Sequence, residues 1–333
     1  MLAFRTFKGT LKRATKPQPW LRRGWALIRL RLAGICNTDV EILRGYHAFR
    51  GVPGHEFVGE VAEVHGVSAA QKQKWMGRRV CGEINVGCAA YGDRAACDFC
   101  KRGMKTHCAR RTVLGIVAHD GAFAEFLTLP LENLHLVPDS VSDEQAVFVE
   151  PLAAACEILE QIEARNFREA AILGDGKLAQ LIALALRTAI PRILMYGKYE
   201  NKLALARQTG CEAYHVPRDA CALKRLNDSF VLVVEATGSR AGLALAQQLA
   251  APRGMVVLKS TFHGNGPEIW PIVVKELTVI GSRCGPFAKA MALLESGKLD
   301  PTPLITRTFP LAEAPKAMRF AQKPGVMKVL LKG

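Results

Sequence analysis

Two patterns of hydrophobic and polar residues divide the chain near its middle. Before about residue 136, apolar residues come in short alternating runs, such as FVGEVAEV (57–64) and GAFAEFLTLP (121–130), cut by glycine, proline and polar residues. Alternation with a period of two is typical of half-buried β-strands. We therefore expect the first part of the chain to be rich in β-strands and to contain few helices.

After residue 150 the pattern changes to strands that alternate with helices. The stretch AAILGDGKLAQLIALALRTAIPRILMYG (170–197) reads as a short strand, a glycine turn, a long helix and a second strand. Further apolar runs predict a helix over 201–209, strands over 230–236, 254–260 and 277–282, and a helix after Ser239. Such alternation predicts a parallel, doubly wound sheet. The tail after Phe287 reads as helix, strand (304–309), helix and terminal strand (326–332).

Composition narrows the class of protein. The 333 residues are 49% hydrophobic and 23% charged, which suits a globular protein of about two domains and excludes disordered and fibrous classes. The net charge of +15 could reflect nucleic acid, an anionic surface or an anionic cofactor such as a dinucleotide. The basic residues are spread along the chain and are not interleaved with aromatic residues, so we expect a solvated basic surface and no nucleic-acid partner.

The first 31 residues bear on the compartment. They hold nine Lys or Arg and no acid but lack a continuous apolar run, so they fit neither a signal peptide nor a membrane span. A transit peptide is the alternative, which the strand-like alternation of Gly24 to Cys36 disfavours. We expect a cytoplasmic protein without a membrane partner, whose ten cysteines are thiols or metal ligands.

The glycine turn Gly174 to Ala179 (GDGKLA) lies directly between a predicted strand and a predicted helix. Gly174 would allow a tight turn, Gly176 would let the backbone approach a pyrophosphate, and Ala179 is small enough for packing. The amino end of the helix adds a positive dipole. This arrangement predicts a dinucleotide site, although the same turn could serve packing alone.

The end of the next strand bears on which nicotinamide cofactor binds. NAD-binding folds usually carry Asp or Glu about twenty residues after the glycine turn, but here the strand ends at Tyr196 and Gly197 and is followed by Lys198. An ammonium group suits the 2′-phosphate of NADP, so we expect NADP(H) over NAD(H). Two alternatives remain: Glu200 could accept from the ribose, and Lys198 could simply be solvated.

Three segments carry candidate zinc ligands: GICNTD (34–39), GHEFVGEV (54–61) and VEPLAAA (149–155). A thiolate from Cys36, an imidazole from His55 and a carboxylate from Glu56 or Glu150 would leave one position for water or substrate, as a catalytic zinc requires. Each residue alone also has a purely structural interpretation as a buried cysteine, a core histidine or a surface glutamate.

Four more cysteines fall close together at Cys88, Cys97, Cys100 and Cys108, with eight, two and seven residues between them. They could form disulfides, a redox pair at Cys97 and Cys100, or a metal cage. A reducing compartment disfavours disulfides, and four thiolates are a common ligand set for structural zinc.

Taken together with Ala236 to Gly238 (ATG), these motifs resemble the zinc-dependent medium-chain dehydrogenase/reductase family, in the alcohol dehydrogenase superfamily. The Glu-Pro motif at Glu150 is similar to the sorbitol, threonine and glucose dehydrogenase branch. The resemblance implies an α/β fold with two domains. A GroES-like β-barrel catalytic domain would cover 1–148, with 287–333 returning to it, and a Rossmann domain with a doubly wound parallel sheet would cover 149–286.

The resemblance also implies that the four clustered cysteines hold a structural zinc. The family has two residues between its first and second cysteine, whereas eight separate Cys88 and Cys97 here, so AAYGDRAA (89–96) looks like an insertion. Cys81 could replace Cys88 as the first ligand.

For the catalytic zinc, the resemblance implies that Cys36 and His55 are ligands together with Glu56 or Glu150, of which Glu150 is slightly preferred. Asp39 would orient His55, and Thr38 would take the alcohol proton toward solvent, with His47 as a further relay candidate. Zinc, as a Lewis acid, would make the alcohol acidic enough to lose this proton. The implied cofactor-binding residues are Gly174, Gly176, Lys177, Leu178, Gly197, Lys198, Thr237 and Gly238.

The expected function is hydride transfer between a secondary alcohol, polyol or sugar and a nicotinamide cofactor. The family resemblance further implies a homo-oligomer, either a dimer or a tetramer. The alternative is a basic zinc-lobe protein that binds nucleic acid, with the Rossmann half as a sensor. Nucleic-acid zinc ribbons usually pair two Cys-x-x-Cys segments, and this sequence has one, at Cys97 and Cys100.

Overall fold

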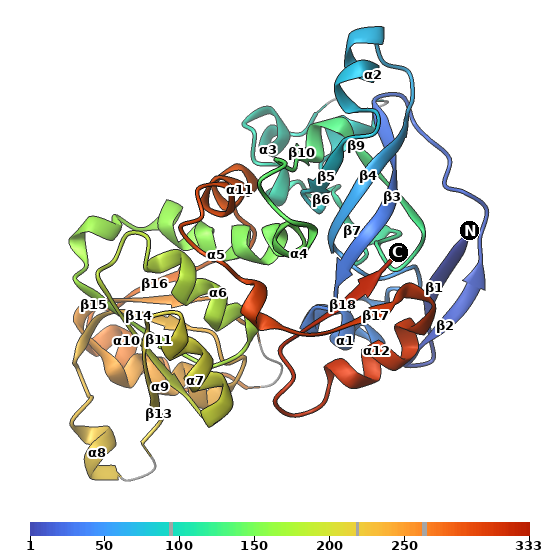
Figure 1. The fold of residues 1–333 in the computed structure, drawn as a ribbon. Helices are drawn as coiled ribbons and strands as arrows, with labels where there is room; N and C mark the ends of the chain where they lie inside the picture. The colour runs from blue at the N-terminus through green and yellow to red at the C-terminus, as the bar shows by residue number, and fades with distance from the viewer. Residues whose placement is uncertain (93–95, 218–219, 262–264) are drawn as a thin grey trace. The chain divides into compact units, whose positions relative to one another are not determined.

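The computed structural model describes residues 1–92, 96–217, 220–261 and 265–333. The chain forms two compact units, one made of Met1–Glu150 with Phe287–Gly333 and the other of Pro151–Pro286. Figure 1 shows the chain from its blue amino terminus to its red carboxyl terminus. In the described ranges, no helix has the length and apolar character needed to cross a membrane.

The first unit is built on a seven-stranded sheet with the order β10-β5-β4-β3-β18-β17, in which β9 also pairs with β3. The predicted β-rich character of this half is confirmed. The strands of the sheet are β3 (Trp25–Gly34), β4 (Glu56–Val64), β5 (Arg79–Gly82), β9 (Phe126–Pro130), β10 (Leu134–Leu136), β17 (Ile305–Pro310) and β18 (Lys328–Lys332). Smaller sheets pair β1 (Leu2–Phe7) with β2 (Thr10–Thr15), and join β6 (Asn85–Val86), β7 (Thr112–Leu114) and β8 (Ala118–His119).

The carboxyl-terminal tail completes this sheet. Strand β18 runs antiparallel to β3, with Leu330 opposite Gly34 and Leu331 opposite Ala33, and β17 runs parallel to β18. Figure 1 shows the red tail strands beside blue β3. The helices with residues in this unit are α1 (Asn37–Leu43), α2 (Ala69–Trp75), α3 (Asp98–Lys101), α4 (Asp143–Ala146), the start of α5 (Val149–Gln161), α11 (Phe287–Glu295) and α12 (Ala314–Ala321).

Alternation along β3 explains how its residues divide between core and surface. Ile28 and Leu30 are buried, whereas Arg29 and Arg31 between and beside them are exposed. Because successive side chains of a strand point to opposite faces, one face of β3 packs into the core. That core also contains Phe4, Phe57, Phe123, Leu127 and Leu129.

The second unit holds a six-stranded parallel sheet with the order β13-β12-β11-β14-β15-β16. In chain order this is 3-2-1-4-5-6, the Rossmann arrangement, which confirms the predicted doubly wound sheet. Its strands are β11 (Glu169–Leu173), β12 (Arg192–Gly197), β13 (Glu212–His215), β14 (Phe230–Glu235), β15 (Ala250–Leu258) and β16 (Thr278–Gly281). The other helices are α6 (Lys177–Leu186), α7 (Glu200–Gln208), α8 (Ala220–Lys224), α9 (Arg240–Leu249) and α10 (Trp270–Val274).

The sequence pattern missed strand β13. This strand has four residues, of which Tyr214 and His215 are exposed, so it carries no apolar run that would distinguish it from a loop. Residues 212–215 form a strand because they pair with β12, where Met195 lies opposite Ala213.

Candidate metal and cofactor sites

The first candidate metal site consists of Cys36, His55 and Glu56, whose ligand atoms all lie within 4.8 Å of one another. Strand pairing brings them together, because Gly34 at the end of β3 lies opposite Glu56 at the start of β4. Cys36 follows β3 and caps the amino end of α1, while His55 directly precedes β4. A thiol, an imidazole and a carboxylate at this spacing form a donor set that suits zinc.

Asp39 holds this corner of the unit in place. Its carboxylate is fully buried and accepts hydrogen bonds from the backbone N–H of Cys36 (2.8 Å) and of Gly54 (3.0 Å). The same carboxylate oxygen that accepts from Gly54 lies 3.4 Å from Nδ1 of His55. Asp39 therefore faces Nδ1 of the histidine and leaves Nε2 for a metal, as the predicted orienting role requires.

The electrostatics of the pocket around His55 favour a cation. Nδ1 is buried and lacks hydrogen-bond geometry to any described residue, in spite of its distance to Asp39. Burial lowers the pKa of His55, but Asp39 and Cys36 outweigh this and hold the pKa well above its ordinary value. Acidic groups thus surround an incompletely satisfied imidazole, so the residues present fit a divalent metal ion.

Glu56 has a second partner that sequence reasoning missed. Its carboxylate forms an ion pair with the ammonium of Lys328 in β18, and both side chains are buried. A Cβ atom at Gly34 would lie 2.2 Å from Glu56 Oε2, so a side chain there would push the Glu56 carboxylate out of its position. No sequence signal links Glu56 to a lysine at the far end of the chain.

The alternative carboxylate, Glu150, is the second residue of α5 and is half-buried. Within the described ranges it does not join Cys36 and His55 in a ligand group, whereas Glu56 does. The geometry therefore favours Glu56 as the carboxylate of this site, and the role expected for Glu150 stays a prediction.

The two predicted proton-handling residues lie in different surroundings. Thr38 is half-buried, and its Oγ1 lies 3.7 Å from Sγ of Cys36. His47 is exposed in the turn Tyr46–Ala48, where its ring lies 4.1 Å from that of Tyr46. The structure thus places Thr38 beside a candidate metal ligand and gives no such contact for His47.

The four clustered cysteines converge on one point, with their sulfur atoms within 4.8 Å of one another. Sγ of Cys88 lies 3.7 Å from that of Cys100, and Sγ of Cys97 lies 3.7 Å from that of Cys108. Four thiolates at about 2.3 Å from a tetrahedral zinc would be roughly 3.8 Å apart, whereas a disulfide requires about 2.05 Å. The spacing fits a metal cage and not a disulfide.

Cys88, and not Cys81, is the first member of this group. Its sulfur accepts from the backbone N–H of Cys97 and from Arg110, each at 3.3 Å, and the N–H of Cys97 lowers the pKa of Cys88 to about 6. Cys81 is buried in β5, where burial raises its pKa. Of the expected insertion 89–96, residues 93–95 lie outside the described ranges, and Tyr91 packs 5.5 Å from the ring of Trp25.

The predicted cofactor residues gather at the carboxyl ends of β11 and β14, where the order of the sheet reverses. Gly174 has φ +116°, and a side chain there would meet the carbonyl oxygen of Ala236 at 2.8 Å. Gly176 caps α6, which begins with Lys177 and Leu178. In doubly wound sheets, ligands bind at this switch point.

Two more predicted residues follow β14. Thr237 donates to Oε1 of Glu235 through its backbone N–H (2.7 Å) and its hydroxyl (2.5 Å), and Gly238 has φ +67°. The loop after β14 is therefore tightly folded against the end of its own strand, next to Gly174.

At the end of β12, Gly197 is buried and Lys198 is exposed. Glu200, the alternative ribose acceptor, is ion-paired with Arg207 (2.6 Å) and bonded to His215 (3.0 Å). A carboxylate that sequence reasoning missed lies here instead: Asp175 accepts from the backbone of Lys198. The available signal was an acid between the two glycines of the turn.

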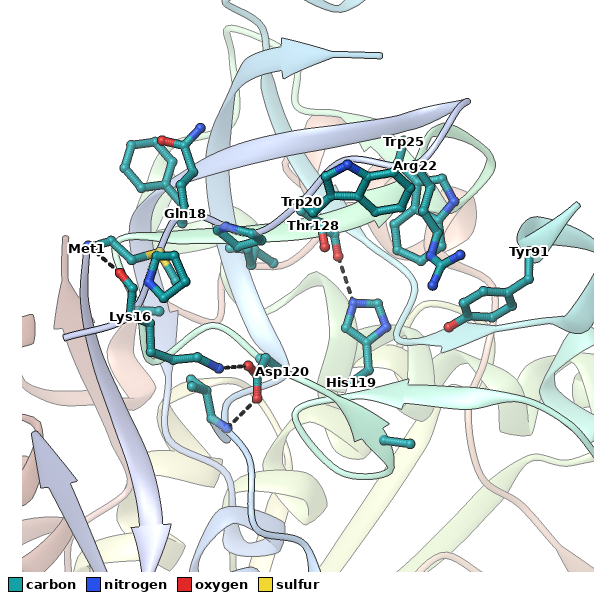
Figure 2. Close-up of a pocket in the computed structure, with 18 residues that line it drawn as sticks. Met1, Lys16, Gln18, Trp20, Arg22, Trp25, Tyr91, His119, Asp120 and Thr128 are labelled. Atoms are coloured by element: carbon teal, nitrogen blue, oxygen red, sulfur yellow. Dashed lines mark hydrogen bonds and ion pairs between the residues drawn. The ribbon is translucent and has the colours of Figure 1, made fainter. Parts of the chain in front are cut away.

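A cavity of about 590 Å³ lies elsewhere in the first unit. Figure 2 shows Trp20, Trp25, Tyr91 and His119 around it, and Lys16 joined to Asp120. His119 stacks on Trp25 with ring centroids 5.7 Å apart, and its Nε2 donates to the carbonyl of Thr128 at 2.9 Å. The lining residues include no member of either metal group.

Comparison with known proteins agrees with this architecture. Residues 22–139 match the family profile of the alcohol dehydrogenase GroES-like domain. The chain is similar to an erythritol/L-threitol dehydrogenase of Mycolicibacterium smegmatis, with 29% identity over 90% of this chain and 88% of the relative.

Two solved structures match both units. One, from Sinorhizobium meliloti, is described as a zinc-binding dehydrogenase bound to NADP; it has 26% identity and a TM-score of 0.88, covering 100% of this chain and 99% of its own. The other is an alcohol dehydrogenase from Escherichia coli CFT073 complexed with NADH, with 26% identity, a TM-score of 0.89 and the same coverage. The Rossmann sheet order, the GroES-like match and these whole-chain similarities confirm the family resemblance. Over its whole length the chain is therefore similar to zinc-dependent medium-chain dehydrogenases of the alcohol dehydrogenase superfamily, and residues 22–139 match the GroES-like domain of alcohol dehydrogenases.

Proposed function

We propose that the protein is a zinc- and nicotinamide-dependent dehydrogenase that oxidises a secondary hydroxyl group of a polyol, sugar or simple alcohol. The observation that carries this proposal is the convergence of Cys36, His55 and Glu56 beside Asp39. The similarity to a dehydrogenase of erythritol and threitol supports a polyol as the first substrate class to test.

Each residue of this site has a separate task. Cys36, His55 and Glu56 would hold the metal, which when bound supplies a Lewis acid that makes an alcohol hydroxyl more acidic. Asp39, whose carboxylate lies 3.4 Å from Nδ1, would orient the His55 ring. Thr38 accepts the alcohol proton and passes it toward solvent. His47 and Glu150 remain weaker candidates, for the relay and for the metal respectively.

A second, structural zinc would be held by the four clustered cysteines. Their two 3.7 Å sulfur separations support a tetrahedral cage. Cys97, Cys100 and Cys108 lie on or beside the short segments Asp98–Lys101 and Lys105–His107, so a metal would tie these segments to the turn at Cys88. A redox pair at Cys97 and Cys100 is the competing interpretation.

Metal analysis of the dialysed protein tests both sites. We expect about two zinc ions per chain in the parent and about one in Cys36→Ser, together with loss of turnover. Cys221→Ser, which changes an exposed cysteine outside both groups, is the matched control and should keep both ions. A parent protein that folds without zinc would overturn the assignment of both sites.

The substrate class requires a direct screen. Secondary alcohols, four- to six-carbon polyols and aldoses would be offered with NADP and NAD, and formation of reduced cofactor would be followed by absorbance. We expect turnover with at least one polyol. No turnover of any compound by a fully zinc-loaded enzyme would contradict the proposed reaction.

For the cofactor, we infer NADP(H) over NAD(H). The support is that β12 ends in Tyr196 and Gly197 without an acid of its own, and that the exposed ammonium of Lys198 follows directly. Dissociation constants of NADPH and NADH, measured by nicotinamide fluorescence, test this inference. Lys198→Ala should weaken NADPH alone, and a parent enzyme that binds NADH more tightly would show the inference to be wrong.

We also infer a homo-oligomer. Strand β16 ends the sheet order of the second unit, and Ile269, Trp270, Val273 and Val274 of the neighbouring segment are 61–72% exposed. Exposed apolar patches on sheet edges commonly mark protein interfaces. Light scattering of the parent and of Val273→Asp would test this surface: the parent should be a dimer or tetramer, and the variant smaller.

The remaining inferences are a cytoplasmic location and a small-molecule substrate without nucleic acid. The support for a reducing compartment is the pair of cysteine-containing groups spaced for metal rather than disulfides. The alternative, a nucleic-acid-binding zinc-lobe protein, predicts salt-dependent DNA retention that the cofactor does not affect. Such retention would revive that alternative.

A further inference from the structure

Asp175 lies between the two glycines of the turn after β11, yet its carboxylate reaches the neighbouring strand. Its Oδ2 accepts hydrogen bonds from the backbone N–H groups of Lys198 (2.6 Å) and Tyr199 (2.8 Å), which follow β12. Asp175 is 8% exposed. An acidic side chain is therefore built into the glycine turn and directed at the position where the next strand ends.

The position of Asp175 leaves no room for a side chain at Gly197, the last residue of β12. A Cβ atom at this position would lie 2.6 Å from Cβ of Asp175 and 2.7 Å from its Oδ2. Any side chain at Gly197 would thus displace the carboxylate. An acidic side chain at position 197 would therefore compete for the space that Asp175 occupies.

The two N–H groups that Asp175 binds would otherwise form a small anion site. Tyr199 caps the amino end of α7, where backbone N–H groups are unpaired and the helix dipole favours a negative charge. These are the donors that a phosphate group on the adenine ribose would need. Asp175 occupies both donors and adds a negative charge of its own.

The carboxylate of Asp175 can also accept further hydrogen bonds. An ionised carboxylate has about four lone-pair positions, and both described hydrogen bonds of Asp175 end on Oδ2. Oδ1 has no hydrogen-bond partner among the residues that the structure describes. A ribose hydroxyl can donate to this oxygen, whereas a 2′-phosphate carries a charge of about −1.5 to −2 at neutral pH and is repelled by the carboxylate.

We propose that Asp175 is a specificity-determining residue that favours an unphosphorylated adenine ribose and limits the binding of NADP(H). The proposal rests on the dinucleotide site of the proposed function. Asp175 and Lys198 then act in opposite directions on the same phosphate, one through repulsion and the other through attraction. The cofactor preference of the enzyme is the balance of the two.

Two nucleotides that differ only in the 2′-phosphate test the proposal without turnover. Adenosine 2′,5′-bisphosphate and adenosine 5′-phosphate would be titrated calorimetrically into the zinc-loaded protein at low ionic strength, where charge effects are least screened. Asp175→Asn keeps the size of the side chain and removes its charge. We expect it to shift the ratio of the two dissociation constants about tenfold toward the bisphosphate, because a 2′-phosphate carries about −1.5 to −2 charges.

Asp228→Asn is the matched control. Asp228 precedes the amino end of β14, whereas Asp175 follows the carboxyl end of the neighbouring parallel strand β11, and Asp228 is ion-paired with Lys275 at 2.6 Å. The control should leave the ratio within about twofold of the parent, as distant surface charges are screened. An unchanged or reversed ratio in Asp175→Asn, with a normal thermal unfolding curve, would overturn the proposal.

A second variant covers the case in which Asp175→Asn does not fold. The hydroxyl of Asp175→Ser can accept one of the two backbone hydrogen bonds, and this variant should shift the ratio in the same direction.

The outcomes distinguish the role of Asp175 from the inferred preference for NADP(H). If the parent prefers the monophosphate but Asp175→Asn still shifts toward the bisphosphate, the NADP(H) inference is wrong and the role of Asp175 stands. If neither nucleotide binds the parent, the dinucleotide site and the role of Asp175 are both wrong.

Discussion

Glu56 and Lys328 form a buried ion pair although they lie 272 positions apart in the sequence. Their side chains are 1% and 2% exposed, and Nζ of Lys328 also lies 5.4 Å from the ring centroid of Phe148. The pair joins the first candidate metal site to the last strand of the chain. Removing two charges from water is costly, so each partner depends on the other.

Lys328→Met should therefore destabilise the zinc-free protein by about 3–5 kcal/mol, because Glu56 would be left buried without its cation. Urea unfolding in the presence of a chelator measures this change. The double variant Glu56→Gln with Lys328→Met should recover most of the loss, since it removes both charges. Equal stability of the parent and the single variant would show that the pair is not energetically coupled.

Thr38→Val keeps the volume of the side chain and removes the hydroxyl. If Thr38 carries the alcohol proton, oxidation should fall roughly 100- to 10,000-fold, the range of general acid–base groups. Zinc content should stay unchanged. Thr308→Val, which changes an exposed residue of β17, is the control and should retain full activity. Loss of zinc in Thr38→Val would instead assign a structural role to this residue.

The cysteine cage predicts a difference between two buried cysteines. Cys88→Ser should remove about one zinc ion per chain and lower the thermal midpoint, because four thiolates are needed to close a structural site. Cys81→Ser should keep both ions, since Cys81 lies outside the cage. Zinc analysis with calorimetry makes the comparison, and the opposite pattern would restore Cys81 as the first ligand.

His119 predicts a pH dependence of stability. Burial lowers its pKa, while the Thr128 carbonyl and Asp120 raise it to a smaller extent. The unfolded chain then binds a proton near pH 6.5 that the folded protein does not, so this contribution is present above about pH 6.5 and is lost as the pH falls. The stability advantage of the parent over His119→Gln should shrink between about pH 7 and 5. An advantage that grows on acidification would contradict the assignment.

The sequence by itself determined the features that depend on neighbours along the chain. Strands β11, β12, β14, β15 and β16 and helices α6, α7 and α9 follow from local periodicity, and the glycine turn from residues 174–179, because dihedral restrictions and helix capping act over a few residues. The spacing of Cys97, Cys100 and Cys108 likewise predicted a metal cage through the family resemblance, with a redox pair as the alternative. The short helices α8 and α10 were not predicted. Strand β13 escaped detection because its four residues carry little apolar pattern of their own.

Only the tertiary structure decided the contacts between distant segments. The antiparallel register of β3 and β4 brings Glu56 close to Cys36 and His55. The pairing of β18 with β3 brings Lys328 into the same sheet. The parallel pairing of β11 and β12 lets Asp175 reach the backbone of Lys198. Each of these ion pairs and hydrogen bonds requires two groups to meet in space. Strand order and register determine whether they meet, and no local pattern of residues encodes either one.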